Sequence, residues 1–198
     1  MANVKREREE QLALANALSR IILSSSRIDE IIEGFAKELK SFVSIDWGAI
    51  ALIEGDSVRL TPLLSKTSDA ADFGSTLPLE RTPIAWVAEN KRALLESDLS
   101  KASQPGTVSF LAKLGKQEIR SMVLMPLFSE GEVFGSFIVA IRNAKSYKEK
   151  ELKLLKYTAS QLASPLADSL LLQRSLSTIA QDFRTPLTPV VASSGLLA

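Results

Sequence analysis

Apolar residues recur at helical spacing over the N-terminal part of the chain. Leu14, Leu18 and Ile21 predict a helix over residues 6–23. After the serines at 24–26 a second helix is expected, because one apolar stripe runs on without a break through Ile28, Ile31, Ile32, Phe35, Ala36, Leu39, Phe42 and Val43. Ser26 and Asp29 have the spacing of a capping box, in which a hydroxyl and a carboxylate satisfy the free N–H groups at a helix start.

The period then shortens to that of strands, and two hairpins are predicted. The first turns at Glu54-Gly55-Asp56 within "DWGAIALIEGDSVRLTPLL", and the second turns between Ser129 and Glu132 within "RSMVLMPLFSEGEVFGSFIVAIRN". Further short strands are expected at residues 76–79 and in "ALLESDL". Pro126 cannot donate a hydrogen bond to a sheet, so it indicates a sheet edge or a bulge.

Shorter helices are predicted between these strands. Thr82 and Pro83 are typical of a helix start, as N-cap and first helical residue of "PIAWVAENKR". "VSFLAKLG" is expected to form one short helix that stops at Gly115. Ser146 and Glu149 form a second capping-box pattern before a long C-terminal helix. This order of elements predicts an α+β fold, in which helices lie on the faces of an antiparallel sheet.

The long C-terminal helix has an alternating spacing of three and four residues. Most of the positions that this spacing selects are apolar, which favours a two-stranded coiled coil. The selected positions are Leu152, Leu155, Ala159, Leu162, Leu166, Ser169, Gln173, Leu176, Ala180 and Phe183. We therefore expect a parallel homodimer through the N- and C-terminal helices. The alternative is that the same stripe packs within one chain. Pro165 removes one backbone hydrogen bond from this helix and should kink it.

Composition excludes much catalytic chemistry. The 198 residues include no cysteine and no histidine, which removes disulfides, zinc–thiolate sites, thiol nucleophiles, histidine-ligated haem and phosphohistidine. The net charge of +1 and the lack of a basic cluster with aromatics argue against a nucleic-acid partner. The N-terminus is charged, and no apolar run reaches the roughly 18 residues of a membrane span. We expect a cytoplasmic protein with no membrane partner in this chain.

Three segments together resemble the GAF domain, a small sensory fold. They are "AWVAENKRALLESDLS", "IRSMVLMPLFSEGEVFGSFIVA" and "SYKEKELKLLKYTASQLASPLADSL", and the resemblance covers about residues 20–172. It implies an N-terminal helix at 1–23 and a GAF sensory domain at 24–172. It also makes a small-molecule ligand a candidate partner of the domain.

The segment "AQDFRTPLTP" resembles the phosphoacceptor motif of histidine kinases, in the first helix of their dimerisation domain. The resemblance implies that residues 173–198 begin this helix, and that the chain is an N-terminal fragment of a larger kinase. The missing kinase domain would bind ATP and Mg²⁺, and the partner of the parent protein would be a response regulator. The histidine position holds Gln181, whose carboxamide nitrogen is a poor nucleophile. No catalytic residue is therefore expected here, and the motif keeps only its frame of Asp182, Arg184, Thr185 and Pro186.

Candidate ligand-contacting residues come from the apolar strands and the large aromatics. We assign this role to Ile50, Leu52, Phe73, Trp86, Val123 and Met125, although a plain core role is the alternative, above all for the aromatics. Asn90-Lys91 matches two residues of a motif in cyclic-nucleotide-binding GAF domains, but an ordinary helix C-terminus explains it better. Asp98 either binds a polar ligand group or caps a turn, and the cap is favoured. The chain itself is expected to hold no cofactor and no metal.

The sequence thus predicts a sensory and dimerisation GAF module of a two-component histidine kinase, which regulates phosphotransfer through a coiled-coil helix. Two rivals stay open: a ligand-free structural GAF spacer, and a GAF domain of a transcription regulator. A third rival, the reduction of free methionine sulfoxide by some GAF proteins, is set aside because that chemistry needs cysteine nucleophiles.

Overall fold

A computed structural model describes residues 2–25, 27–63, 76–102, 104, 106–116, 118–144 and 147–184. Its helices are α1 (Ala2–Ser24), α2 (Ile28–Leu39), α3 (Pro83–Asn90), α4 (Thr107–Lys113) and α5 (Glu149–Arg184), with a short 3₁₀ helix at Leu99–Lys101. Its strands are β1 (Trp47–Glu54), β2 (Ser57–Pro62), β3 (Thr76–Pro78), β4 (Leu94–Glu96), β5 (Ser121–Ser129) and β6 (Glu132–Ile141).

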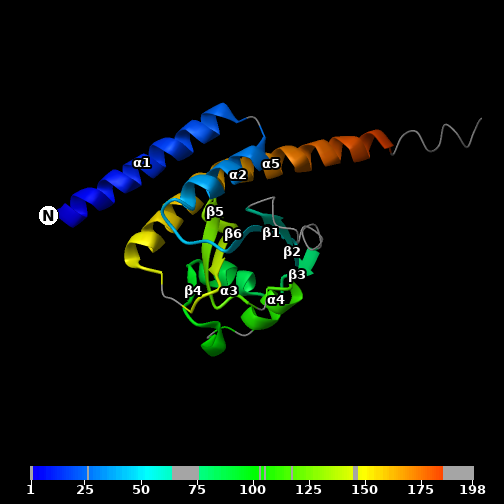
Figure 1. The fold of residues 1–198 in the computed structure, drawn as a ribbon. Helices are drawn as coiled ribbons and strands as arrows, with labels where there is room; N and C mark the ends of the chain where they lie inside the picture. Colours follow the sequence, from blue (N-terminus) through cyan, green and yellow to red (C-terminus); the bar gives the residue numbers. More distant parts are fainter. Residues whose placement is uncertain are drawn as a thin grey trace, which may run out of the picture.

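The six strands form one antiparallel sheet in the order β3-β2-β1-β6-β5-β4. The α1, α2 and α5 helices cover one face of the sheet, and α3 and α4 lie on the other (Figure 1). This arrangement confirms the predicted α+β fold. Both predicted hairpins are present, with Glu54 paired to Ser57 and Ser129 paired to Glu132.

The sheet is buried on both faces, which explains why its strands read as continuous apolar runs. Successive side chains of a strand point to opposite faces. In β1, Ile50 and Leu52 therefore pack under the α1, α2 and α5 helices, whereas Ala49 and Ala51 pack under α3 and α4. Each face thus has its own hydrophobic core, and the sheet separates the two.

Local signals at helix ends are confirmed in part. The Thr82 hydroxyl accepts a hydrogen bond from the Ala85 N–H at 3.3 Å, as expected for the cap of α3. The predicted caps Ser26 and Ser146 lie outside the described residues. The N-cap position of α2 is Arg27, whose side chain makes no capping bond. At the start of α5 the Lys148 N–H donates to the Glu151 carboxylate at 2.7 Å, so Glu151 fills the role predicted for Glu149.

Pro126 lies where the sheet tolerates a proline. Strand β4 pairs with β5 only from Met122 to Leu124, so beyond Leu124 the outer side of β5 is a sheet edge. A register shift also falls between Leu127 and Phe128. Both outcomes predicted for Pro126, an edge and a bulge, are therefore present within a few residues of it.

Candidate functional site

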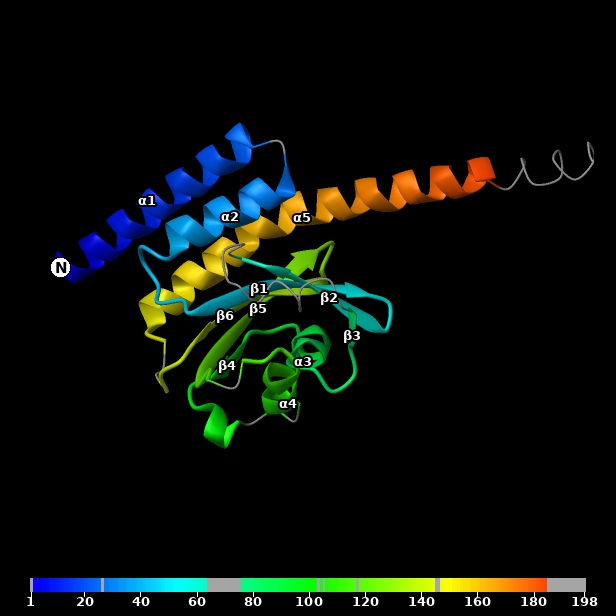
Figure 2. The ribbon, with the colours of Figure 1, turned by 45° about the vertical axis from the view of Figure 1, so that its right-hand side comes forward.

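The α5 helix links the core of the domain to the C-terminal motif. It runs for 36 residues without interruption, through Pro165. Its first part packs on the sheet, where Leu155, Leu162 and Leu166 are at most 2% exposed. Over this part the alternative of packing within one chain is the correct one, because these positions of the predicted seam face the chain's own sheet. Further on, α5 extends beyond the rest of the molecule (Figure 2).

The motif itself stands at the far end of this helix. Gln181, Asp182 and Arg184 belong to the last turns of α5, which ends at Arg184. Thr185 and Pro186 lie outside the described residues. The assignment of these five residues to a phosphoacceptor frame stays a prediction, since it rests on the sequence alone.

The structure divides the predicted ligand-contacting residues between the two faces of the sheet. Ile50, Leu52, Val123 and Met125 belong to the core beneath α1, α2 and α5. Trp86 belongs to α3 on the opposite face, where the Arg92 guanidinium lies 5.1 Å from the centre of its ring. Phe73 lies outside the described residues. These residues therefore do not line one common site. Met125 does border a cavity described below, as does Arg92, the residue that stacks on Trp86.

Three buried polar groups on the α3 and α4 side were missed by the sequence analysis. Trp47 Nε1, Thr107 Oγ1 and Ser136 Oγ make no hydrogen bond with any residue that the structure describes. Trp47 belongs to the core on this side, and Ser136 points there because it is two residues from Ile138. Buried polar groups normally have a partner, so bound water or a polar ligand would satisfy them. The available signal was the single hydroxyl of Ser136 inside an apolar strand.

A polar cavity of about 750 Å³ opens between α3 and the β2–β3 edge of the sheet. Its described lining includes Asp56, Glu80 and Glu89 beside Arg81. Arg81 has a backbone φ of 62°, and its carbonyl lies against Gly106 at the start of α4. The starts of α3 and α4 therefore touch on this side (Figure 2). No group of three or more acidic residues among the described residues could hold a metal ion.

Asp98 and Lys91 have structural roles at helix ends. The Asp98 carboxylate caps the 3₁₀ helix, since it accepts from the Ser100 N–H at 3.1 Å and from the Ser100 hydroxyl at 2.8 Å. These bonds from Ser100 hold the pKa of Asp98 below its usual value, and Arg120 contributes to the shift. Lys91 ends α3 in the left-handed conformation, and its ammonium lies 2.7 Å from Glu132. The cap expected for Asp98 and the helix end expected at Lys91 are confirmed.

No described helix is long and apolar enough to cross a membrane.

The fold and the sequence together define the class of protein. A family model described as GAF domain matches residues 25–167. The chain therefore belongs to the GAF domain family, whose members serve as sensory and regulatory modules. No curated protein matches the sequence.

Solved structures with this fold come from proteins of different activities. The GAF domain of an Acinetobacter phosphoenolpyruvate-protein phosphotransferase has a TM-score of 0.67 at 15% identity, and the match covers 83% of this chain and 97% of that one. The GAF domain of a two-component sensor histidine kinase from Bacillus halodurans has a TM-score of 0.64 at 20% identity, with 75% and 99% covered. A free methionine-R-sulfoxide reductase from Neisseria meningitidis has a TM-score of 0.60 at 16% identity, with 78% and 88% covered. At these identities the likeness concerns the fold alone.

Proposed function

We propose that this chain is the sensory and dimerisation module of a cytoplasmic two-component sensor histidine kinase. Residues 24–172 form the sensory domain, with the helix at 1–23 before it. Residues 173–198 begin the helix that carries the phosphoacceptor position. The kinase domain of the parent protein would bind ATP and Mg²⁺, and a response regulator would receive the phosphate.

The continuity of α5 is the observation that carries this proposal. One helix contacts the sheet through Leu155 and Leu162 and also contains Gln181 near its end. A change at the sheet can therefore reach position 181 as a shift or rotation of a rigid element. A structural spacer would not need the buried, unpaired hydroxyls of Thr107 and Ser136 on the α3 and α4 side, which favours a ligand-binding domain.

Gln181 determines what the motif can do. Phosphotransfer needs an imidazole nitrogen that attacks the γ-phosphate, and an adjacent carboxylate that orients the ring and accepts its proton. The lone pair of a carboxamide nitrogen is delocalised into the carbonyl, so Gln181 cannot attack and Asp182 has no proton to take. The chain therefore offers the helix of a phosphotransfer site without its reaction.

A transfer assay tests the proposal. The chain and its Gln181→His variant are each mixed with labelled ATP and the catalytic domain of a two-component histidine kinase that is active on its own phosphoacceptor helix. We expect acid-labile phosphate on the histidine variant only. Adding Asp182→Asn to that variant should lower its labelling rate by about 100-fold, the lower end of the range for general base catalysis.

The control is the same reaction without the catalytic domain, run on both the glutamine and the histidine form. Without the catalytic domain neither form should be labelled, because the sequence contains no Gly-rich phosphate loop with the required Lys and Ser/Thr. Acid-labile label on the glutamine form would contradict the assigned role of Gln181. A histidine variant that stays unlabelled beside the active catalytic domain would show that the motif only resembles a phosphoacceptor site.

A further inference from the structure

A second cavity lies on the other side of the sheet from the polar one, against α5. It has a volume of about 380 Å³, within the range of about 300–1,000 Å³ that is usual for small-molecule sites. Its walls come from three places: the segment Lys91–Ala93 that joins α3 to β4, the second half of β5, and the middle of α5.

The cavity exists because β4 is short and α5 carries small residues here. Beyond Leu124 none of the described strands pairs with the outer side of β5, so Met125, Pro126 and Phe128 have space beside them. On α5 the facing residues are Ala159, Ser160 and Ala163, which do not reach far enough to fill that space. Phe128 is 42% exposed. The floor of the cavity is therefore apolar and open to solvent on one side.

The rim of the cavity is cationic. Lys91, Arg92 and Lys156 line it, and no carboxylate is found among the lining residues that the structure describes. Lys91 is held by Glu132 at 2.7 Å and by the Gly131 carbonyl at 3.2 Å, and Arg92 stacks on Trp86. Lys156 makes no ion pair with any residue that the structure describes. Two cations are thus fixed in place, and a third is available to a ligand.

We propose that this cavity binds a small amphiphilic monoanion, in which a carboxylate, sulfonate or phosphate ester is attached to one or two apolar rings. The rings would cover the apolar floor at Met125, Pro126 and Phe128. The anionic group would lie at the rim, where Lys156 and Arg92 can donate charge-assisted hydrogen bonds to it. Glu132 offsets the charge of Lys91, but Arg92 and Lys156 leave the rim with net positive charge, which attracts an anion and disfavours a cation of the same shape.

The position of the cavity gives its ligand a route to the C-terminal helix. Such a ligand would sit between the sheet edge and α5, so it would favour one placement of α5 over another. This regulatory role rests on the function proposed above, whereas the binding itself does not.

Two fluorescent probes that differ only in charge test the binding. 8-Anilinonaphthalene-1-sulfonate is an anion with an apolar ring system, and N-phenyl-1-naphthylamine is the same molecule without the sulfonate. We expect the wild-type chain to bind the sulfonate at a single site, about tenfold more tightly than the uncharged amine, which is a difference of about 1.4 kcal/mol.

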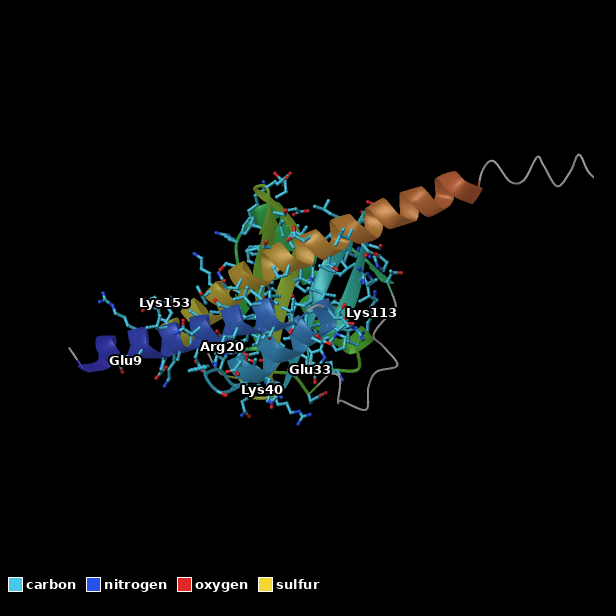
Figure 3. All side chains as sticks on the ribbon, turned by 90° about the horizontal axis from the view of Figure 1, so that it is seen from above. Glu9, Arg20, Glu33, Lys40, Lys113 and Lys153 are labelled. Atoms are coloured by element: carbon cyan, nitrogen blue, oxygen red, sulfur yellow. The ribbon has the colours of Figure 1, made fainter. Side chains whose placement is uncertain are left out.

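Three variants locate the site. Lys156→Glu should weaken binding of the sulfonate by about tenfold or more and change binding of the amine by less than about twofold. Ala163→Leu should weaken both probes, because its side chain occupies the space that the rings need. Ser160→Phe is a second filling variant at an exposed position, and it keeps the test valid if Ala163→Leu lowers stability. Lys40→Glu, at the C-terminal end of α2 and away from the lining, should change neither probe (Figure 3).

The proposal is overturned if the sulfonate does not bind. It is also overturned if the amine binds as tightly as the sulfonate, or if Lys156→Glu and both filling variants leave sulfonate binding as in the Lys40→Glu control. The assay contains no kinase and no ATP, so its failure would leave the phosphotransfer result untouched, and the reverse also holds.

Discussion

At the scale of single residues, Tyr147 makes the stability of the fold depend on pH. It is only 5% exposed beneath α5, and its hydroxyl makes no hydrogen bond with any residue that the structure describes. Burial raises the pKa of Tyr147 above its ordinary value of 10.0, and the carboxylates of Glu151 and Asp46 raise it further. The phenol is therefore neutral in the folded chain at pH values where it ionises in the unfolded chain.

This shift makes stability depend on Tyr147 at high pH. Because the folded pKa is raised, the folded state holds its proton more tightly than the unfolded state above pH 10, so the free energy of unfolding falls as pH rises there. We expect the wild type to lose about 1.4 kcal/mol per pH unit in that range relative to Tyr147→Phe. At pH 7 the phenylalanine variant should be equal to or about 1 kcal/mol more stable than the wild type, since it buries no unpaired hydroxyl.

Urea unfolding of the wild type and of Tyr147→Phe at pH 7, 10 and 11 measures the difference between their free energies of unfolding. Both proteins contain the same lysines, so deprotonation of lysine does not contribute to that difference. If the two free energies fall in parallel above pH 10, burial does not raise the pKa of Tyr147. If Tyr147→Phe costs more than about 1 kcal/mol at pH 7, the hydroxyl has a hydrogen-bond partner in the folded chain.

At the scale of elements, the start of α4 depends on one glycine. Gly106 has a φ of 90°, and a Cβ atom there would collide with the Arg81 carbonyl at the start of α3. Gly55, in the β1–β2 turn, also has a positive φ of 61°, but nothing lies within 4 Å of its missing Cβ. A side chain at Gly55 would therefore cause backbone strain alone, whereas a side chain at Gly106 would cause backbone strain and a steric collision.

Alanine at each position tests this distinction. Gly55→Ala should cost about 1 kcal/mol, the strain of a left-handed alanine, whereas Gly106→Ala should cost about 3 kcal/mol because the two helix starts must also move apart. Chemical unfolding gives both values. Equal costs would mean that α4 does not pack tightly on the Arg81 carbonyl.

The sequence predicted elements well because their signals are local. Turn glycines, the Thr82 cap and strands buried on both faces identify almost every element without knowledge of its neighbours. The same signals do not tell which strands pair. The short β4, and with it the cavity beside Met125, depends on a pairing of residues 94–96 with 122–124 that no local pattern encodes.

The candidate site was less predictable for a related reason. Grouping Ile50 with Trp86 failed because the local pattern of α3 does not tell which face of the sheet that helix covers, and α3 packs on the face opposite to Ile50. The spacing along α5 likewise marks an apolar stripe but does not specify its partner. From Leu155 to Leu166 that partner is the chain's own sheet.

At the scale of the whole molecule, the proposed homodimer depends on how the helices are arranged on the sheet. The α1 helix packs against both α2 and α5, and α5 continues past them (Figure 3). Leu171 and Leu172, near the point where it leaves the domain, are 61% and 67% exposed. From Leu172 an apolar stripe recurs at a spacing of four, three and four residues, at Leu172, Leu176, Ile179 and Phe183. It departs from the seam predicted above, because Leu172 and Ile179 replace their neighbours Gln173 and Ala180. This is the spacing of a two-stranded coiled coil, and it supports the proposed parallel homodimer.

The central claim is that α5 leaves the GAF domain as one continuous helix and pairs with the same helix of a second copy. The measurement that tests it most directly is a cysteine scan, because the chain has no cysteine of its own. Single cysteines are introduced at each position from 171 to 184, and the yield of oxidised dimer is measured. In a parallel pair each residue near the axis faces its own counterpart. We therefore expect maxima at positions 172, 176, 179 and 183 and minima at 174 and 181, which lie on the opposite side of the helix. A profile with no helical period, or no cross-linked dimer at any position, would contradict the account.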